Sequence, residues 1–219
     1  MMAELDSRAA SVLDFWFPDN GHWTVPERHM AFWDERMQGG MDAAIRERFA
    51  AVAEAGARGE LDGWADTAQG RLALILVLDQ FPRSLWRDAP GAFGQDIKAC
   101  RLCLEGVANG HYAALSNPWE RMFYVIAISH CEGPDHLERM DLCIRLVDEM
   151  KPLWPDALAP LADGANEQNR TVREVIARFG RHPHRNAVLG RMSTAAEDAY
   201  VAAGDFPHKR KAADVAEQG

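Results

Sequence analysis

The side chains best suited to bind or transfer charge lie in a basic segment near the end of the chain. Residues 170–191 contain six arginines and two histidines but one glutamate, whereas the whole chain has a formal net charge of -9. Arg181, His184, Arg185 and Asn186 fall between two expected helices, in a loop held at both ends. Guanidinium groups bind carboxylate or phosphate through paired hydrogen bonds that lysine cannot reproduce. We therefore predict an anion site here, in which Arg181 and Arg185 clamp the ligand.

A second polar group follows an apolar helix in the middle of the chain. His130 could act as a general acid or base, with Glu132 as the group that orients it. Glu132 itself and His184 of the basic loop are the other catalytic candidates. A histidine at a helix end can equally be structural, because the negative end of the helix dipole favours positive charge there. The sequence leaves both interpretations open.

Seven consecutive apolar residues, 72–78, lead directly into a third polar group. A helix that is apolar on every side must lie inside the protein, and this run is far shorter than the roughly 20 residues that span a bilayer. Asp79, Gln80 and Arg83 then emerge at the end of a buried helix, which we expect Pro82 to stop. A buried Asp–Arg pair at this place could bind a ligand or could only fix the helix end.

These three segments share one property, since each ends an apolar helix with charged or amide side chains. We predict that they converge on one pocket for a small phosphate or carboxylate ligand, formed by Asp79, Gln80, Arg83, His130, Glu132, Arg181, His184, Arg185 and Asn186. The prediction requires the side chains of Asp79 and Arg181 to lie on the same side of the molecule.

Two alternatives remain open at this point. Arrays of helical hairpins bind peptides on a concave face, so the chain could be a protein or peptide interaction scaffold. Its anchors would be large aromatic side chains, here Trp23, Trp33, Trp64, Trp86 and Trp154. The polar motifs could instead be purely structural, with the arginines paired to acidic residues of neighbouring helices.

The elements that must position these groups are helices, because helical periods and caps recur along the chain and alternating strand patterns do not. The clearest start combines asparagine, proline and glutamate at residues 117–120. Thr194 and Glu197 have the spacing of a capping box for a last helix. About ten helices with short connections predict an all-α fold of antiparallel hairpins. We expect a single domain over residues 1–206 and a flexible polar tail over residues 207–219.

Composition narrows the function classes. The chain has 219 residues, 47% hydrophobic, and a pI of about 5.4, so binding to nucleic acid or to an anionic membrane is not expected. It lacks a secretory signal pattern, and we expect a cytoplasmic protein. The phosphate-loop, dinucleotide, zinc-protease and nucleophile-elbow motifs are absent, so we expect no cofactor and no metal. Cys100 and Cys103 lack a second ligand pair and are interpreted as buried helix residues.

Several motifs together resemble a bacterial family known as domain of unknown function 924. They are residues 78–83, 130–132, 179–186 and 189–194, with an opening at 15–17 and a turn at 59–64. The resemblance implies an all-α superhelix of the tetratricopeptide-repeat-like type and implies no particular reaction. The family pattern has a histidine where this chain has Val172, which removes a possible third imidazole for a proton relay or a metal site.

Overall fold

The computed structural model describes residues 5–204, apart from the side chain of residue 163, and within them it contains helices and no strand. The predicted all-α class is confirmed, and the tail predicted for residues 207–219 lies outside the described residues. The α-helices are α1 (Ser7–Trp16), α2 (Pro26–Met37), α3 (Asp42–Ala57), α4 (Ala68–Leu85), α5 (Asp96–Ala108), α6 (His111–Ala114), α7 (Pro118–His130), α8 (His136–Met150), α9 (Ala159–Gly164), α10 (Glu167–Phe179) and α11 (Ala195–Ala203). Short 3-10 helices connect them, namely η1 (His22–Thr24), η2 (Asp62–Asp66), η3 (Pro90–Phe93), η4 (Lys151–Leu153), η5 (Asp156–Leu158) and η6 (Pro183–Arg185).

Helix α4 lies at the centre of the core. Its N-terminus is capped by Thr67, whose Oγ1 accepts a hydrogen bond from Gly70 N at 3.1 Å. Every residue of the apolar run 72–78 is at most 1% exposed, because α1, α3, α5 and α7 all pack against α4. The burial of this run fixes the position of the polar side chains that follow it.

Pro82 does not stop this helix, and the prediction that it would is wrong. Helix α4 continues to Leu85 with Pro82 inside its last turn. A proline removes one backbone hydrogen bond from a helix interior, but the backbone bond from Trp86 N to Pro82 O, 2.9 Å, still closes the final turn. Arg83 therefore stays helical and lies one turn beyond Asp79, on the same face of α4.

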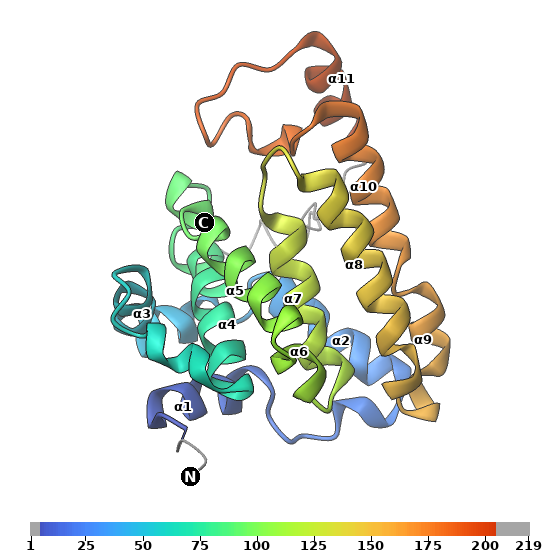
Figure 1. Ribbon diagram of the computed structural model, residues 1–219. Helices are drawn as coiled ribbons and strands as arrows, with labels where there is room; N and C mark the ends of the chain where they lie inside the picture. The colour runs from blue at the N-terminus through green and yellow to red at the C-terminus, as the bar shows by residue number, and fades with distance from the viewer. Residues whose placement is uncertain (1–4, 205–219) are drawn as a thin grey trace.

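Helices α3, α4, α5, α7, α8 and α10 form a row in which each helix packs against its predecessor (Figure 1). Successive helices run in opposite directions. The C-terminal ends of α4, α7 and α10 consequently lie at the same end of the molecule as the N-terminal ends of α5 and α8, the upper end in Figure 1. This row agrees with the predicted hairpins, while the finer tetratricopeptide-like superhelix stays a prediction.

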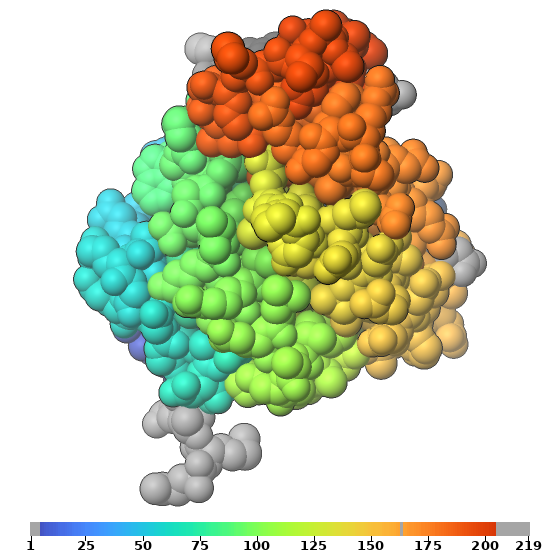
Figure 2. Space-filling view, turned by 45° about the horizontal axis from the view of Figure 1, so that its top comes forward, coloured from blue at the N-terminus to red at the C-terminus, as the bar shows by residue number. Residues whose placement is uncertain are grey.

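The segment after α10 covers this end of the row. In the space-filling view, its orange and red atoms lie over the green and yellow atoms of α5, α7 and α8 (Figure 2). Among the helices of the described residues, none is both long enough and apolar enough to cross a membrane. All four cysteines are buried and form no disulfide, which agrees with their interpretation as core side chains.

Candidate functional site

A buried carboxylate and a histidine meet where α4 and α7 end. Asp79, which is 0% exposed, places Oδ1 2.9 Å from His130 Nδ1. Gln80 Nε2 donates to Asp79 Oδ2 at 2.6 Å, and Arg83 Nη1 lies 3.1 Å from Asp79 Oδ1. The two helix ends that supply these groups are separated by 51 residues in sequence. The structure thus brings together the predicted groups of the α4 and α7 ends.

The basic loop adds Arg185 to this cluster. Arg185 is 4% exposed, and its Nη1 donates to the His130 carbonyl oxygen at 2.8 Å and to Asp96 Oδ2 at 3.1 Å. Arg83 Nη2 also donates to both carboxylate oxygens of Asp96, at 2.9 and 3.1 Å. The guanidinium carbons of Arg83 and Arg185 lie 5.7 and 4.6 Å from the ring centroid of Phe93. Five charged or ionisable side chains from α4, α5, α7 and η6 therefore form one network, which we call the end cluster: Asp79, Arg83, Asp96, His130 and Arg185.

Asp96 and Phe93 were not among the residues predicted from the sequence. Asp96 is the first residue of α5, where an acidic residue is an ordinary stabilising feature at the positive end of the helix dipole, so nothing local marks it as a site residue. The useful signal is the alternation of helix directions, which places the start of α5 beside the end of α4. Phe93 ends η3, just before α5.

Burial changes the ionisation of this network. It raises the pKa of Asp96 to about 6, because removing the carboxylate from water outweighs the attraction of Arg83. Burial, together with the like charge of Arg83, lowers the pKa of Arg185 to about 10. Protonation of Asp96 near pH 6 therefore removes one negative charge that faces the two guanidinium groups.

Glu132 is held in a second network beside the end cluster. Its Oε1 accepts a hydrogen bond from the backbone N of His182 at 2.7 Å, and its carboxylate pairs with the guanidinium of Arg191. Burial alone would raise the pKa of Glu132, but these two donors hold it below the ordinary value. Among its recorded contacts Glu132 does not orient His130, the role that the sequence suggested for it. Arg191 was not predicted as its partner.

The carbonyl groups at the end of α7 accept hydrogen bonds from three further side chains. Arg139 Nη1 donates to the carbonyl oxygens of Ile128, at 3.2 Å, and Cys131, at 2.7 Å. Nε2 of His136 and of His182 lie 2.9 and 3.2 Å from the Ser129 carbonyl oxygen. The last carbonyls of a helix have no partner within the helix, so these side chains fix the end of α7 and, with it, His130.

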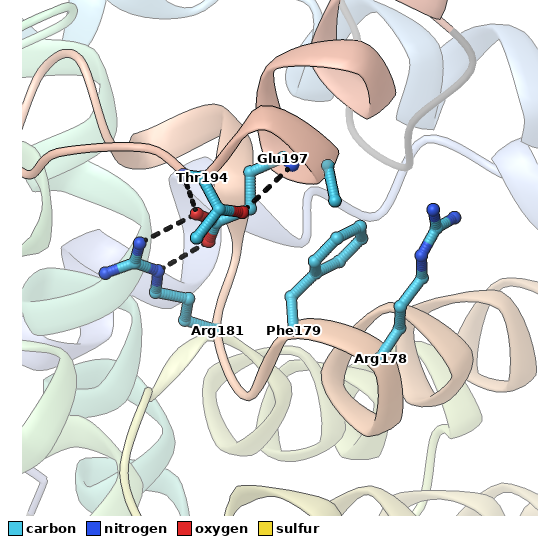
Figure 3. Close-up of a pocket in the computed structure, with 6 residues that line it drawn as sticks. Arg178, Phe179, Arg181, Thr194 and Glu197 are labelled. Carbon is cyan, nitrogen blue, oxygen red and sulfur yellow. Dashed lines mark hydrogen bonds and ion pairs between the residues drawn. The ribbon is translucent and has the colours of Figure 1, made fainter.

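Within the described residues, the hydrogen bonds of Arg181 go to groups outside the end cluster. Its Nε and Nη2 donate to Glu197 Oε1 and Oε2 at 2.6 and 2.8 Å (Figure 3). Nη2 also donates to the Met192 carbonyl oxygen at 3.0 Å. This pair holds the pKa of Glu197 well below its usual range. Arg181 lines a cavity of about 470 Å³ together with Arg178, Phe179, Thr194, Ala196 and Glu197. The paired donors of Arg181 therefore face Glu197.

The other two predicted loop residues, His184 and Asn186, flank Arg185 of the end cluster in the sequence. The ring of His184, which is half-buried, lies 5.4 Å from that of His182. Asn186 is 1% exposed and donates from Nδ2 to Ser193 Oγ at 3.0 Å. Within the described residues, the buried atoms Asn186 Oδ1 and Arg185 Nε have no hydrogen-bond partner.

The described part of the chain contains no group of three or more His, Cys, Asp or Glu side chains arranged to hold a metal ion. The carboxylate of Asp79 can hold one ring nitrogen of His130, which is the arrangement that fixes the tautomer of a catalytic histidine, and two guanidinium groups stand beside it.

Comparison with known proteins gives a family but no reaction. Residues 12–205 match the model of a family described as a bacterial protein of unknown function, DUF924. A solved structure of a protein of unknown function from Agrobacterium tumefaciens, ATU0120, is similar, with 31% sequence identity, a TM-score of 0.64, and coverage of 90% of this chain and 98% of that one. A search of curated proteins finds no match. Because the family model spans most of the sequence, the chain belongs to the bacterial DUF924 family of unknown function.

Proposed function

We propose that this protein binds a small anion, a phosphate or a carboxylate, between Arg83 and Arg185 in the end cluster. The observation that carries the proposal is the guanidinium of Arg185, which is almost fully buried and whose Nε has no partner within the described residues. An unpaired buried donor is costly unless a ligand or water satisfies it. The nearby guanidinium of Arg83, beside the same Phe93 ring, supplies a second positive group.

The charge of the end cluster makes this binding depend on pH. At neutral pH the carboxylate of Asp96 pairs with both arginines, which opposes anion binding. Because burial raises the pKa of Asp96 to about 6, protonation below that pH removes one competing carboxylate from Arg83 and Arg185. Anion affinity should therefore rise as the pH falls from 7.5 to 5.5.

If the ligand is turned over, His130 is the acid or base best supported by its surroundings. Asp79 holds its Nδ1 at 2.9 Å, and Arg185 binds its carbonyl oxygen, so the ring is held beside the proposed anion. Gln80 completes this support by its hydrogen bond to Asp79. The geometry gives weaker support to Glu132, which is paired with Arg191, and to Arg181, which is paired with Glu197.

Isothermal titration calorimetry with inorganic phosphate and with succinate, at pH 5.5 and pH 7.5, tests this proposal. We expect tighter binding at pH 5.5, and a loss of at least tenfold in affinity in Arg185→Lys, since lysine cannot provide the fork of donors. Arg101→Lys is the matched control, because Arg101 is exposed and makes only a surface pair with Glu105. Asp96→Asn should bind with a weaker pH dependence than the wild type, since only the titration of the anion itself then remains.

No binding at either pH by the folded protein, at anion concentrations up to about 10 mM, would overturn the proposal. Equal affinity of the wild type and Arg185→Lys would do the same, because it would show an anion bound elsewhere.

The alternative is an interaction scaffold of the tetratricopeptide-like type, with the polar motifs purely structural. The row of alternating helices supports it, but the five tryptophans proposed as anchors do not, because each is buried or half-buried. A cytoplasmic setting forms part of either proposal, and the four cysteines without a disulfide support it.

A further inference from the structure

A cavity at the other end of α7 combines aromatic rings with acidic side chains. It has a volume of about 460 Å³ and lies between the segment that follows α1, the start of α7, and the connection after η4. Its lining includes the aromatic rings of Phe17, His22, Trp23 and Trp119 and the carboxylates of Asp19 and Glu120, and no lysine or arginine. His130 and Glu120 occupy opposite ends of α7, so this cavity is separate from the end cluster.

The aromatic wall is built around His22. The rings of Trp23 and Trp119 lie 5.6 Å apart and nearly parallel, at 13°. His22 meets both edge to face, at centroid distances of 5.0 and 5.3 Å. Burial lowers the pKa of His22 to about 4, so its ring is neutral at physiological pH and adds no positive charge to the wall.

Two basic side chains whose charges act on His22 direct their donors away from the cavity. Arg28 donates to the Asn20 carbonyl oxygen at 2.6 Å, and Arg36 donates to the carbonyl oxygens of Trp16 and Phe32. Neither arginine lines the cavity. The charge that the cavity presents is therefore that of its two carboxylates.

Glu120 has an unsatisfied acceptor. Its Oε2 is buried and has no hydrogen-bond partner within the described residues. Burial raises the pKa of Glu120, although hydrogen bonds from the side chains of Asn117 and Gln69 to its carboxylate and the positive end of the α7 dipole favour the ionised form. A donor that carries positive charge is the group that would satisfy this oxygen and reverse the shift.

We propose that this cavity binds a protonated alkylamine, whose ammonium group donates to Glu120 Oε2 and whose alkyl part packs against Trp23 and Trp119. Aromatic faces attract ammonium groups by the cation–π interaction, and the same rings shield the alkyl chain from water. The two carboxylates disfavour an anion. A metal ion is disfavoured because the described residues contain no group of three acidic, histidine or cysteine ligands.

Three probes with the same butyl chain test the proposal by calorimetry at pH 7.5, namely n-butylammonium, n-butanol and butyltrimethylammonium. We expect n-butylammonium to bind at least tenfold more tightly than either of the others, because butanol lacks the charge and butyltrimethylammonium lacks the N–H donor. Glu120→Gln should reduce its affinity at least tenfold, and Trp23→Leu should also weaken it.

Glu138→Gln is the matched control, because Glu138 is also the third residue of its helix but is exposed. It should leave the affinity unchanged. Circular dichroism and thermal unfolding establish that each variant is folded before its affinity is compared.

Equal binding of butanol and butylammonium would overturn the proposal by showing a purely apolar cavity. Equal binding of butyltrimethylammonium would overturn the hydrogen bond to Glu120, as would an unchanged affinity in folded Glu120→Gln. No binding of n-butylammonium to the folded wild type at about 20 mM would overturn the site itself.

Discussion

The carboxylate of Asp79 lies 2.9 Å from Nδ1 of His130, although 51 residues separate them in the chain. Asp79 directly follows the apolar run of α4, and His130 is the last residue of α7. This contact joins the central helix, α4, to α7, the next helix of the row that runs in the same direction. The pair is also the contact on which both the structural and the chemical interpretations of the end cluster depend.

Asp79→Asn should destabilise the protein by about 3 kcal/mol, within the range for breaking a buried ion pair. Asparagine has the same size but no charge, so Arg83 and His130 lose the negative charge that both of them face. Urea unfolding at pH 7 measures the change. Asp14→Asn is the control, since Asp14 is exposed and its change should stay within about 0.5 kcal/mol. A similarly small effect of Asp79→Asn would show that this contact does not stabilise the fold.

Arg181→Lys should loosen the start of α11 while leaving the rest of the fold intact. Arg181 gives Glu197 two hydrogen bonds, and Glu197 in turn accepts from Thr194 N at 2.8 Å in the capping box that opens α11. Lysine can replace only one of the two bonds. Hydrogen exchange should therefore become faster in α11 but not in α4.

Arg178→Lys provides the comparison for this change. Arg178 lines the same cavity (Figure 3) but lies over the Phe179 ring, 4.7 Å from its centroid. The exchange of α11 amides should remain at the wild-type rate in this variant. Equal effects of the two substitutions would argue against the specific pair of Arg181 with Glu197.

His22 and His29 should make the fold less stable as the pH falls from 6.5 to 4. Burial lowers the pKa of each to about 4, so the unfolded chain takes up protons in this interval while the folded protein does not. Each histidine contributes a slope of up to about 1.4 kcal/mol per pH unit. The Nδ1 atoms lie 2.9 Å apart, so one must donate and the other accept, which excludes protonation of both.

Urea unfolding at several pH values tests this, with His29→Phe as the variant that cannot be protonated. Its stability should fall less steeply than that of the wild type between pH 6.5 and 4. Asp96 acts in the opposite direction between about pH 4 and 6, because its raised pKa keeps a proton on the folded form. Identical slopes for His29→Phe and wild type would show that His29 is not the group responsible.

Gly106→Ala should destabilise the protein by about 1–3 kcal/mol through overpacking. A Cβ atom at residue 106 would lie 2.7 Å from Tyr124 Cε1 and 2.8 Å from Arg71 Cδ, at the contact of α5 with α7 and α4. The better helix propensity of alanine, worth up to about 1 kcal/mol, offsets part of this cost. Thermal unfolding measures the net change. Gly63→Ala is the control, because no atom lies within 4 Å of its added Cβ.

Much of the fold follows from local patterns in the sequence. The buried run 72–78 and the capping box of Thr194 with Glu197 are where the sequence predicted them. These features depend on residues a few positions apart, so the local sequence pattern predicts them. The prediction that Pro82 stops α4 is wrong because Pro82 lies so near the helix terminus that the surrounding packing outweighs its local effect.

The partners in the candidate site could not be predicted in the same way. The sequence marked Asp79, His130 and Arg185 as polar groups that end apolar helices, but it did not mark Asp96, whose carboxylate joins Arg83 to Arg185. It also placed Arg181 in a ligand clamp, whereas the described contacts pair its donors with Glu197 and the Met192 carbonyl.

The sequence by itself determined the helices, the buried run at the centre, and the charged ends that needed partners. Only the tertiary structure decided which carboxylate each arginine meets, because that choice depends on which helix ends the alternating row brings to one side. Electrostatic attraction does not depend on how far apart two residues are in the sequence. An arginine therefore pairs with whichever carboxylate the packing places within reach and out of water.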